Sequence, residues 1–217
     1  MIRILVAHSN DASRKYLRRL IERQCDWHVC AEAENGGSAV QLAIEQSPDI
    51  VILDAALTGT NALQVARQIG QARLESEILV LMTLEADDLV RDLLRAGVKA
   101  CLVNAQMDEH LIAAVDALSQ HRPYLTPPVA RAVLSSFLAP RDSGNDAAGS
   151  YGRLTSRERE IFQLFAEGHG NSAISRLLAI RVKTVQTHRT RIMKKLGVGS
   201  LAELVRYAIR NGLIHPL

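Results

Sequence analysis

The first 120 residues of the chain alternate between short apolar runs and amphipathic stretches with helical spacing. The apolar runs are mostly continuous, as in the strands of a parallel sheet that is buried on both faces. They predict strands at residues 2–7, 28–32, 50–53, 78–82 and 100–103. The amphipathic stretches predict helices at residues 12–23, 37–46, 61–69, 86–96 and 108–119. Five strands alternating with five helices predict a flavodoxin-like (βα)5 domain of the α/β class, whose ligands sit beyond the carboxyl ends of the strands.

The pattern changes after residue 122. Residues 128–138 predict one more amphipathic helix, and the stretch that follows is rich in Gly, Ser, Asn, Asp and Pro, which predicts a flexible linker. Four short amphipathic segments then predict an all-α, four-helix unit. We therefore expect an α/β domain at residues 1–122, a helix and linker at 123–153 and a helical domain at 154–217.

Two of the four helices begin with a recognisable cap. Thr155 with Glu158 and Ser200 with Glu203 both match the S/T-x-x-E capping box. In this motif each side chain satisfies a backbone donor that the helix leaves without a partner. Both helix starts are predicted on that ground.

The two middle helices predict a helix-turn-helix. Asn171 can cap a short helix that runs to Leu178, and residues 179–181 then make a tight turn. A longer helix follows at residues 182–196 and ends at Gly197. Two helices joined by so short a turn are typical of DNA-binding proteins.

The longer helix has one apolar and one polar face. Val182, Val185, Ile192 and Leu196 recur with helical spacing, and we expect them to be buried. The opposite face and its flanks are basic and rich in hydroxyl groups. The DNA-binding residues expected there are Lys183, Thr184, Gln186, Thr187, His188, Thr190, Arg191, Lys194 and Lys195.

These side chains suit a nucleic-acid groove. Gln186 can bond adenine through its amide, and Thr187 and Thr190 can meet a base edge or a thymine methyl group. Lys and Arg serve phosphates or guanine. A basic helix face can also be merely solvated. The agreement of spacing, caps and charge favours DNA binding instead.

Charge divides the chain near the same place. Residues 151–217 hold 12 Lys and Arg against 4 Asp and Glu, a net charge of +8. Residues 1–150 hold 14 against 19, a net charge of −5. A compact basic unit favours polyanions because each Lys or Arg placed on a phosphate releases condensed counterions. We therefore expect the carboxyl-terminal domain to bind double-stranded DNA.

The carboxyl-terminal domain resembles the LuxR-type DNA-binding domain of NarL/FixJ-family response regulators. The resemblance rests on LTSREREIFQLFAEG, VKTVQTHRTRIMKKLGV and AELVRYAIRNGLI. It implies that the third helix recognises the major groove and that the last helix pairs two copies over a palindromic site. The apolar stripe of that last helix, which serves pairing or burial within the domain, consists of Leu201, Leu204, Val205, Ala208 and Ile209.

The same domain departs from the family at two places. Ser172 and Ala173 stand where the family often has Lys and Glu, which weakens phosphate anchoring there. Arg181 stands where the family favours a Ser cap, so the third helix begins less firmly or gains a phosphate contact.

The amino-terminal domain resembles the receiver domain of the same family. The matching segments are SPDIVILDAALTGTNALQVARQI and LLRAGVKACLV. The resemblance implies that Asp54, at the end of the third strand, is the position at which a histidine kinase phosphorylates a receiver. Forming such an acyl phosphate requires Mg²⁺, because a carboxylate and a phosphoryl dianion repel each other.

Most residues around Asp54 differ from those of a phosphorylated receiver. His8 and Ser9 stand where the family has two acidic residues, and neither is a good Mg²⁺ ligand. Asp11 comes late and fits a helix cap better than a metal ligand. The other departures are Asn104 for a Lys, Met82, with Thr83 next to it, for a hydroxyl residue, and Thr58 and Ala62 for a Pro and a Gly.

The sequence therefore predicts a sequence-specific DNA-binding transcription regulator whose degenerate receiver works without Mg²⁺-dependent phosphorylation. Control would come from dimerisation, a protein partner or a small ligand, and Asp54 would be vestigial. One alternative is a conventional response regulator phosphorylated on Asp54 by a histidine kinase. Another is a pseudo-receiver adaptor whose output is protein binding. A hydrolase triad of His8, Ser9 and Asp54 lacks a nucleophile elbow and an oxyanion hole, so we expect no enzyme.

Cysteine usage and hydropathy indicate the compartment. Cys25, Cys30 and Cys101 are odd in number and form no CxxC pair, so we expect buried thiols in a reducing cytoplasm. The apolar run at the amino terminus is too short for a signal peptide or a membrane span. We expect a cytoplasmic homodimer without a metal, another cofactor or a membrane partner.

Overall fold

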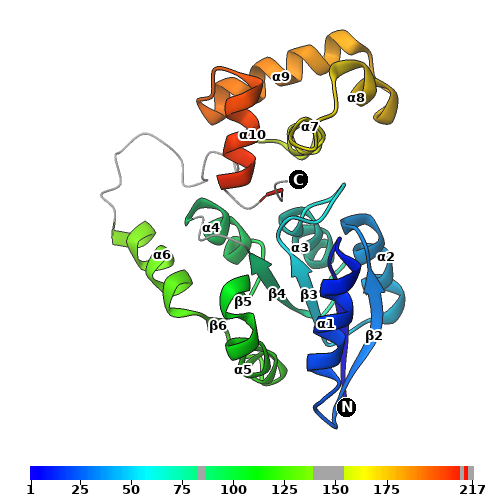
Figure 1. Cartoon of the computed structure of the whole chain (residues 1–217), viewed down its shortest axis with the longest axis vertical. Helices are drawn as coiled ribbons and strands as arrows, with labels where there is room; N and C mark the ends of the chain where they lie inside the picture. Colours follow the sequence, from blue (N-terminus) through cyan, green and yellow to red (C-terminus); the bar gives the residue numbers. More distant parts are fainter. Residues whose placement is uncertain (83–86, 139–153, 211–212, 215–217) are drawn as a thin grey trace.

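The structure is a computed structural model that describes residues 1–82, 87–138, 154–210 and 213–214. It contains an amino-terminal α/β domain and a carboxyl-terminal helical domain (Figure 1). The predicted linker at residues 139–153 and Thr83 lie outside the described residues.

A parallel sheet forms the centre of the amino-terminal domain. Its strand order is β2–β1–β3–β4–β5–β6. The strands are β1 (Ile2–Ala7), β2 (Trp27–Ala33), β3 (Ile50–Asp54), β4 (Glu77–Met82), β5 (Ala100–Val103) and β6 (Tyr124–Leu125). Every residue of β3 and β4 is buried, as expected for central strands that helices cover on both faces.

Helices cover both faces of this sheet (Figure 1). The helices are α1 (Asp11–Ile21), α2 (Gly36–Gln46), α3 (Ala62–Gln71), α4 (Asp87–Arg95), α5 (Met107–Ser119) and α6 (Pro127–Leu138), with a short 3-10 turn η1 (Asn104–Gln106) before α5. The core of one face includes α1 and α5, and the core of the other includes α2, α3 and α4. The predicted flavodoxin-like α/β class is confirmed.

The predicted strands and helices of this domain form within two residues of their expected ends, a margin usual for such boundaries. Strand β6 was not predicted, because two residues are too short for an apolar pattern. It pairs with β5 at Ala100–Tyr124 and Cys101–Leu125. Helix α6 follows directly and packs against α4.

Two details of the amino-terminal domain correct the expectations. Asn10, and not Asp11, caps α1, because its side chain accepts the Ser13 N–H at 3.0 Å. Asp11 is the first helical residue and pairs with Lys15 at 2.7 Å. Cys25 is exposed rather than buried, since it lies in the loop between α1 and β2, outside the core.

The carboxyl-terminal domain has the four predicted helices. They are α7 (Ser156–Ala166), α8 (Asn171–Leu177), α9 (Val182–Leu196) and α10 (Leu201–Arg210). Its buried apolar core includes Ile161, Phe162, Phe165, Ile174, Val185, Ile192, Leu196, Leu204 and Ala208. Among the described residues, no helix of the chain is both long and apolar enough to span a membrane.

The caps of α7 and α10 follow the predicted chemistry. The hydroxyl of Thr155 accepts the Glu158 N–H at 3.2 Å, and the Glu158 carboxylate accepts the Thr155 N–H at 2.8 Å. The Ser200 hydroxyl accepts the Glu203 N–H at 3.1 Å. The Glu203 carboxylate bonds the N–H of Gly199 at 2.6 Å, one residue before the expected donor.

The ends of α8 and α9 agree with the sequence in part. Gly197 ends α9 in the left-handed conformation, with a φ of 69°. Asn171 does not cap α8, because Gly170 holds that place and Asn171 is the first helical residue. Arg181 precedes α9 without a side-chain cap, as the departure from Ser predicted. Val182 is 38% exposed rather than buried, since the start of α9 lies at the domain surface.

A partly buried ion pair fixes α9 against α7. The Lys195 ammonium donates to Glu158 at 2.6 Å, and Glu158 is only 3% exposed. Burial acts to raise the pKa of Glu158, but the hydrogen bonds from Lys195 and Thr155 outweigh it, so the pKa is lowered. The guanidinium of Arg189 lies 6.0 Å from the centre of the Phe165 ring and adds a second contact between these helices.

We predict that Glu158→Gln lowers the free energy of unfolding by about 1–3 kcal/mol at neutral pH, because Lys195 loses its charged partner. A carboxyl group whose pKa is lowered by folding stabilises the protein above its unfolded pKa, about 4.3 for Glu. The advantage of the wild type over the variant should therefore shrink as the pH falls through the lower folded value. Denaturant unfolding at several pH values measures it. Glu160→Gln, at the exposed Arg157 pair, should cost less than about 0.5 kcal/mol, and equal losses would contradict the prediction.

A second prediction concerns Gly36, where α2 begins. A Cβ atom there would lie 1.6 Å from the Thr60 carbonyl oxygen, in the loop that follows β3. Gly36→Ala should therefore lower the free energy of unfolding by about 1–3 kcal/mol. A Cβ at Gly37 would meet only the Asn35 Oδ1, at 3.4 Å, so Gly37→Ala should cost nothing. Thermal unfolding of both variants compares them, and a stable Gly36→Ala protein would refute the close approach.

Candidate DNA-binding face and phosphoacceptor pocket

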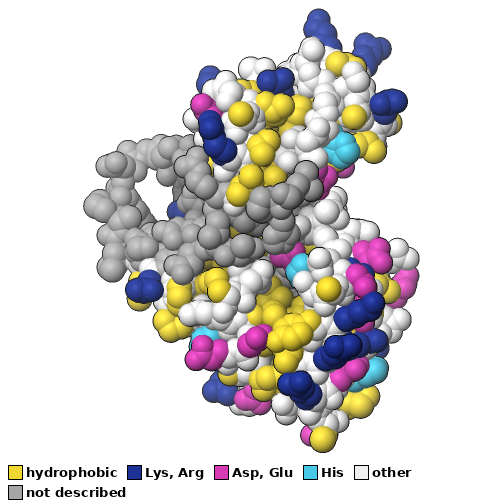
Figure 2. All heavy atoms as spheres, in the orientation of Figure 1, with side chains coloured by type: hydrophobic (Ala, Val, Ile, Leu, Met, Phe, Trp, Pro, Cys, Tyr) yellow, Lys and Arg dark blue, Asp and Glu magenta, His cyan; other side chains and the backbone are white. Residues whose placement is uncertain are grey.

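The outer face of α9 is open to solvent. Its exposed members are Lys183, Thr184, Gln186, Thr187, Thr190, Arg191 and Lys194. Helix α9 lies on the side of its domain that faces away from the sheet (Figure 1). Lys and Arg side chains gather on this outer side, whereas the α/β domain mixes basic and acidic side chains (Figure 2). The structure thus brings seven of the nine expected residues onto one accessible surface.

The two threonines present their methyl groups on this surface. The hydroxyl of Thr187 donates to the Lys183 carbonyl at 3.0 Å, and that of Thr190 donates to the Gln186 carbonyl at 3.2 Å. Their protons are thus used within the helix, so contact with a thymine methyl suits them better than donation to a base. The Gln186 amide has no hydrogen-bond partner in the described part of the chain.

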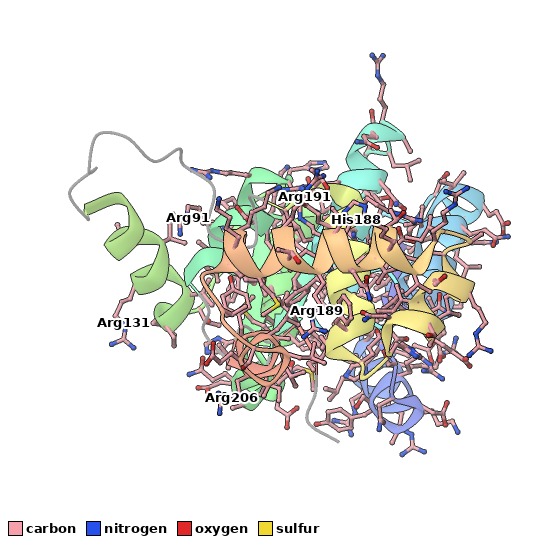
Figure 3. The ribbon with its side chains drawn as sticks, turned by 90° about the horizontal axis from the view of Figure 1, so that it is seen from above. Arg91, Arg131, His188, Arg189, Arg191 and Arg206 are labelled. Atoms are coloured by element: carbon pink, nitrogen blue, oxygen red, sulfur yellow. The ribbon has the colours of Figure 1, made fainter. Side chains whose placement is uncertain are left out.

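Two flanking residues are less accessible than expected. Lys195 is half-buried, and its ammonium is held by Glu158. His188 is half-buried, and its Nδ1 is enclosed without a hydrogen-bond partner among the described residues. Figure 3 shows His188 and Arg191 on one edge of α9 and Arg189 on the other. A DNA contact by Lys195 would have to compete with its ion pair.

The apolar stripe of α10 divides between two roles. Leu204 and Ala208 are fully buried in the core of their own domain, so neither can reach a second copy. This corrects the expectation that they belong to a dimer interface. Leu201, Val205 and Ile209 remain half-buried and follow one another at i+4 spacing on α10.

Helix α7 contributes contacts between the two domains. The Gly59 N–H, in the loop after β3, donates to Glu167 at the end of α7 at 3.3 Å. Asp92 of α4 is 2% exposed and lies near Arg67 of α3 and Arg159 of α7. Burial raises the pKa of Asp92, and these two guanidinium groups act against the rise. The domain contact therefore leaves uncovered the exposed outer face of α9, which is called the reading face below.

The carboxyl edge of the sheet holds the predicted phosphoacceptor. Asp54 ends β3 and is fully buried, and its Oδ1 accepts the Ala56 N–H at 3.3 Å. The Nε2 of His8 lies 3.7 Å from the Asp54 Oδ2. The Nδ1 of His8 accepts the Asn10 N–H at 3.0 Å, which assigns the ring proton to Nε2 in the neutral form.

Ser9 and Arg14 hold the segment after β1 in place. The Ser9 hydroxyl accepts the Thr58 N–H at 3.3 Å, which ties it to the loop after β3. The Arg14 guanidinium donates to the His8 carbonyl at 2.7 Å and pairs with Glu32 at 3.7 Å. Sequence reasoning missed Arg14. Its signal was a charged residue on the buried stripe of α1, which also contains Leu17 and Ile21.

The remaining pocket positions supply no charge. Met82 is fully buried at the end of β4, and Asn104 stands half-buried at the end of β5. In the ranges 1–82, 87–138, 154–210 and 213–214, no three His, Cys, Asp or Glu residues group so that they could hold a metal ion. The pair of His8 and Ser9 beside one buried carboxylate does not fit Mg²⁺, which prefers several oxygen ligands and water.

Comparison with known proteins assigns both domains. Residues 152–208 match the family of bacterial regulatory proteins called the luxR family, and residues 4–116 match the response regulator receiver domain. The chain is 35% identical to the transcriptional regulatory protein LiaR of Bacillus subtilis, over 99% of this chain and all of LiaR. It is 31% identical to the oxygen regulatory protein NreC of Staphylococcus epidermidis, over 98% and 99% of the two chains.

Solved structures have the same two-domain fold. The response regulator ChrA of a heme-sensing two-component system is 30% identical, with a TM-score of 0.52 over 98% of both chains. The response regulator RcsB in complex with DNA is 19% identical, with a TM-score of 0.59 over 96% of this chain and 98% of RcsB. The chain therefore belongs to the NarL/FixJ family of response regulators, DNA-binding transcription regulators that join a receiver domain to a LuxR-type helix-turn-helix domain.

Proposed function

We propose that this protein regulates transcription by reading a specific DNA sequence with α9. The observation that carries the proposal is the row of exposed groove-compatible side chains on α9, on the side away from the receiver. The similarity to LiaR, a transcriptional regulatory protein, and to RcsB, whose complex with DNA has been solved, supports it. We assign residues 1–122 to the receiver, 123–153 to a helix and linker, and 154–217 to the DNA-binding domain.

Within α9, Gln186 reads a base, and Lys183, Arg191 and Lys194 hold phosphates or guanine. Two copies bind a palindromic site, with their reading helices about one DNA turn apart. The half-buried stripe of Leu201, Val205 and Ile209 is the surface of α10 that remains for pairing.

We further propose that the receiver controls this activity without Mg²⁺-dependent phosphorylation. The support is the donor set around Asp54, in which His8, Ser9 and Asn104 replace the acidic residues and the Lys of the family. The Lys with which the family neutralises a phosphoryl group is replaced by Asn104 in this chain, so that neutralisation is lost. The second candidate is conventional phosphorylation by a histidine kinase, which the position of Asp54 at the end of β3 favours.

Two substitutions on the reading face should weaken DNA binding in different ways. Gln186→Ala should cost about 1–3 kcal/mol of binding free energy on the cognate site and relax preference at one base position. Lys194→Ala should weaken binding to all sequences similarly and reduce the salt dependence. Selection of sites from random DNA, followed by gel-shift titration, measures both.

An unchanged selected motif for Gln186→Ala would show that this face is wrongly assigned. A salt-dependent but sequence-independent shift by the wild type would favour a protein-binding adaptor with residual DNA affinity.

The receiver proposal predicts that Asp54 is dispensable for DNA binding. Wild type and Asp54→Ala should footprint the selected site equally, with and without Mg²⁺ and acetyl phosphate. Intact mass measured on the same samples reports phosphorylation. Stoichiometric, Mg²⁺-dependent phosphorylation of Asp54 that alters the footprint would establish the conventional response regulator instead.

A further inference from the structure

A hollow of about 350 Å³ opens beside the phosphoacceptor position. It lies at the carboxyl edge of the sheet, between the first turns of α1 and the start of α5. Its lining residues are His8, Ala12, Ser13, Tyr16, Leu17, Leu81, Asn104 and Met107. This volume falls within the range of small-molecule sites, and ligands of doubly wound sheets bind at this edge.

The walls of the hollow are apolar with a few neutral polar groups. Ala12, Tyr16 and Met107 supply accessible apolar surface over the buried Leu17 and Leu81, whereas His8, Ser13 and Asn104 supply an imidazole, a hydroxyl and an amide. No lining residue carries a formal charge while His8 is neutral, the form in which its Nδ1 accepts the Asn10 N–H.

One contact ties the two helices that flank the hollow. The Tyr16 hydroxyl of α1 donates to the Asp108 carboxylate of α5 at 2.7 Å. The carboxylate holds the pKa of Tyr16 above its ordinary value, so the phenol stays protonated. Asp108 itself is exposed and is not one of the lining residues.

Two of the three positions that remove charge from the phosphoacceptor site are also walls of this hollow. His8 stands where the family has an acidic residue, and Asn104 stands where it has a Lys. Both substitutions replace a charged group with a neutral one that can donate and accept hydrogen bonds. An apolar ligand that covered a charged side chain would strip it of water at a large cost in free energy, and this cost is absent when the side chain is neutral.

We propose that this hollow binds a small, neutral, largely apolar molecule that carries one or two hydrogen-bonding groups. The inference deepens the proposed control of the receiver without phosphorylation and rests on it. The apolar part of the ligand lies on Ala12, Tyr16 and Met107, and its polar group meets Ser13 or Asn104. Because Asn104 begins η1, which leads into α5, a ligand on Asn104 also bears on the start of α5.

Methionine methyl NMR signals can show whether a small molecule binds in the hollow or elsewhere, because the chain has four methionines and one of them lines the hollow. Met107 lines the hollow, whereas Met1, Met82 and Met193 do not. We expect indole, a flat neutral molecule with one N–H donor, to shift the methyl NMR signal of Met107 saturably in the full-length protein. The other three methyl signals should stay in place.

Variants separate binding in the hollow from binding elsewhere. Ala12 is exposed at the start of α1, so Ala12→Leu should fill the hollow without disturbing the core and abolish the saturable shift. Ala202→Leu makes the same change at an exposed position of α10 and should leave the shift intact. Asn104→Lys, which restores the charge of the family, should weaken indole binding at least tenfold.

The inference is overturned if indole leaves Met107 unmoved, moves all four methyl signals alike, or binds Ala12→Leu as well as wild type. Phosphorylation of Asp54 in the mass measurement, with indole still bound at Met107, would refute the proposed control and leave the binding site standing. An unmoved Met107 in a protein that is not phosphorylated would refute the site alone.

Discussion

The burial of the central strands is the constraint on which the rest of the receiver depends. Every side chain of β3 and β4 is enclosed, so helices must cover both faces of the sheet and only the strand ends stay accessible. The carboxyl ends of β1, β3 and β5 consequently bring His8, Asp54 and Asn104 to one edge. Whatever the receiver senses there is set by these end residues, because the faces of the sheet are unavailable.

A comparable constraint acts on α9 in the other domain. Val185, Ile192 and Leu196 bury a narrow stripe of the helix, and the ion pair of Lys195 with Glu158 fixes its place on α7. The opposite face does not pack against the rest of the domain, so polar and basic side chains there do not destabilise the core. Rigid support on one face and solvent on the other suit a helix that reads DNA.

The periodicity of the sequence predicted the helices and strands and the apolar face of each, but not which residues each face contacts. The continuous apolar runs located β1, β3, β4 and β5 because these strands are buried on both sides, whereas the two residues of β6 carry no such pattern. Spacing along α10 identified an apolar stripe but could not tell that Leu204 and Ala208 face inward. The ion pairs of Arg14 with Glu32 and of Lys195 with Glu158 join different elements of the chain, so the local pattern marked Arg14 only as a charged residue on a buried stripe and could not name either partner.

The contact between the domains limits how the receiver can act on DNA binding. It includes α7, where Glu167 meets Gly59 and Arg159 lies near Asp92, and α9 is exposed on the other side. A signal in the receiver therefore cannot work by uncovering α9 in this arrangement. Two reading helices on one duplex must instead match a spacing of about 34 Å. In the proposed dimer on a palindromic site, a movement of α7 against the receiver would change that spacing, and with it the affinity for DNA, without altering a base contact.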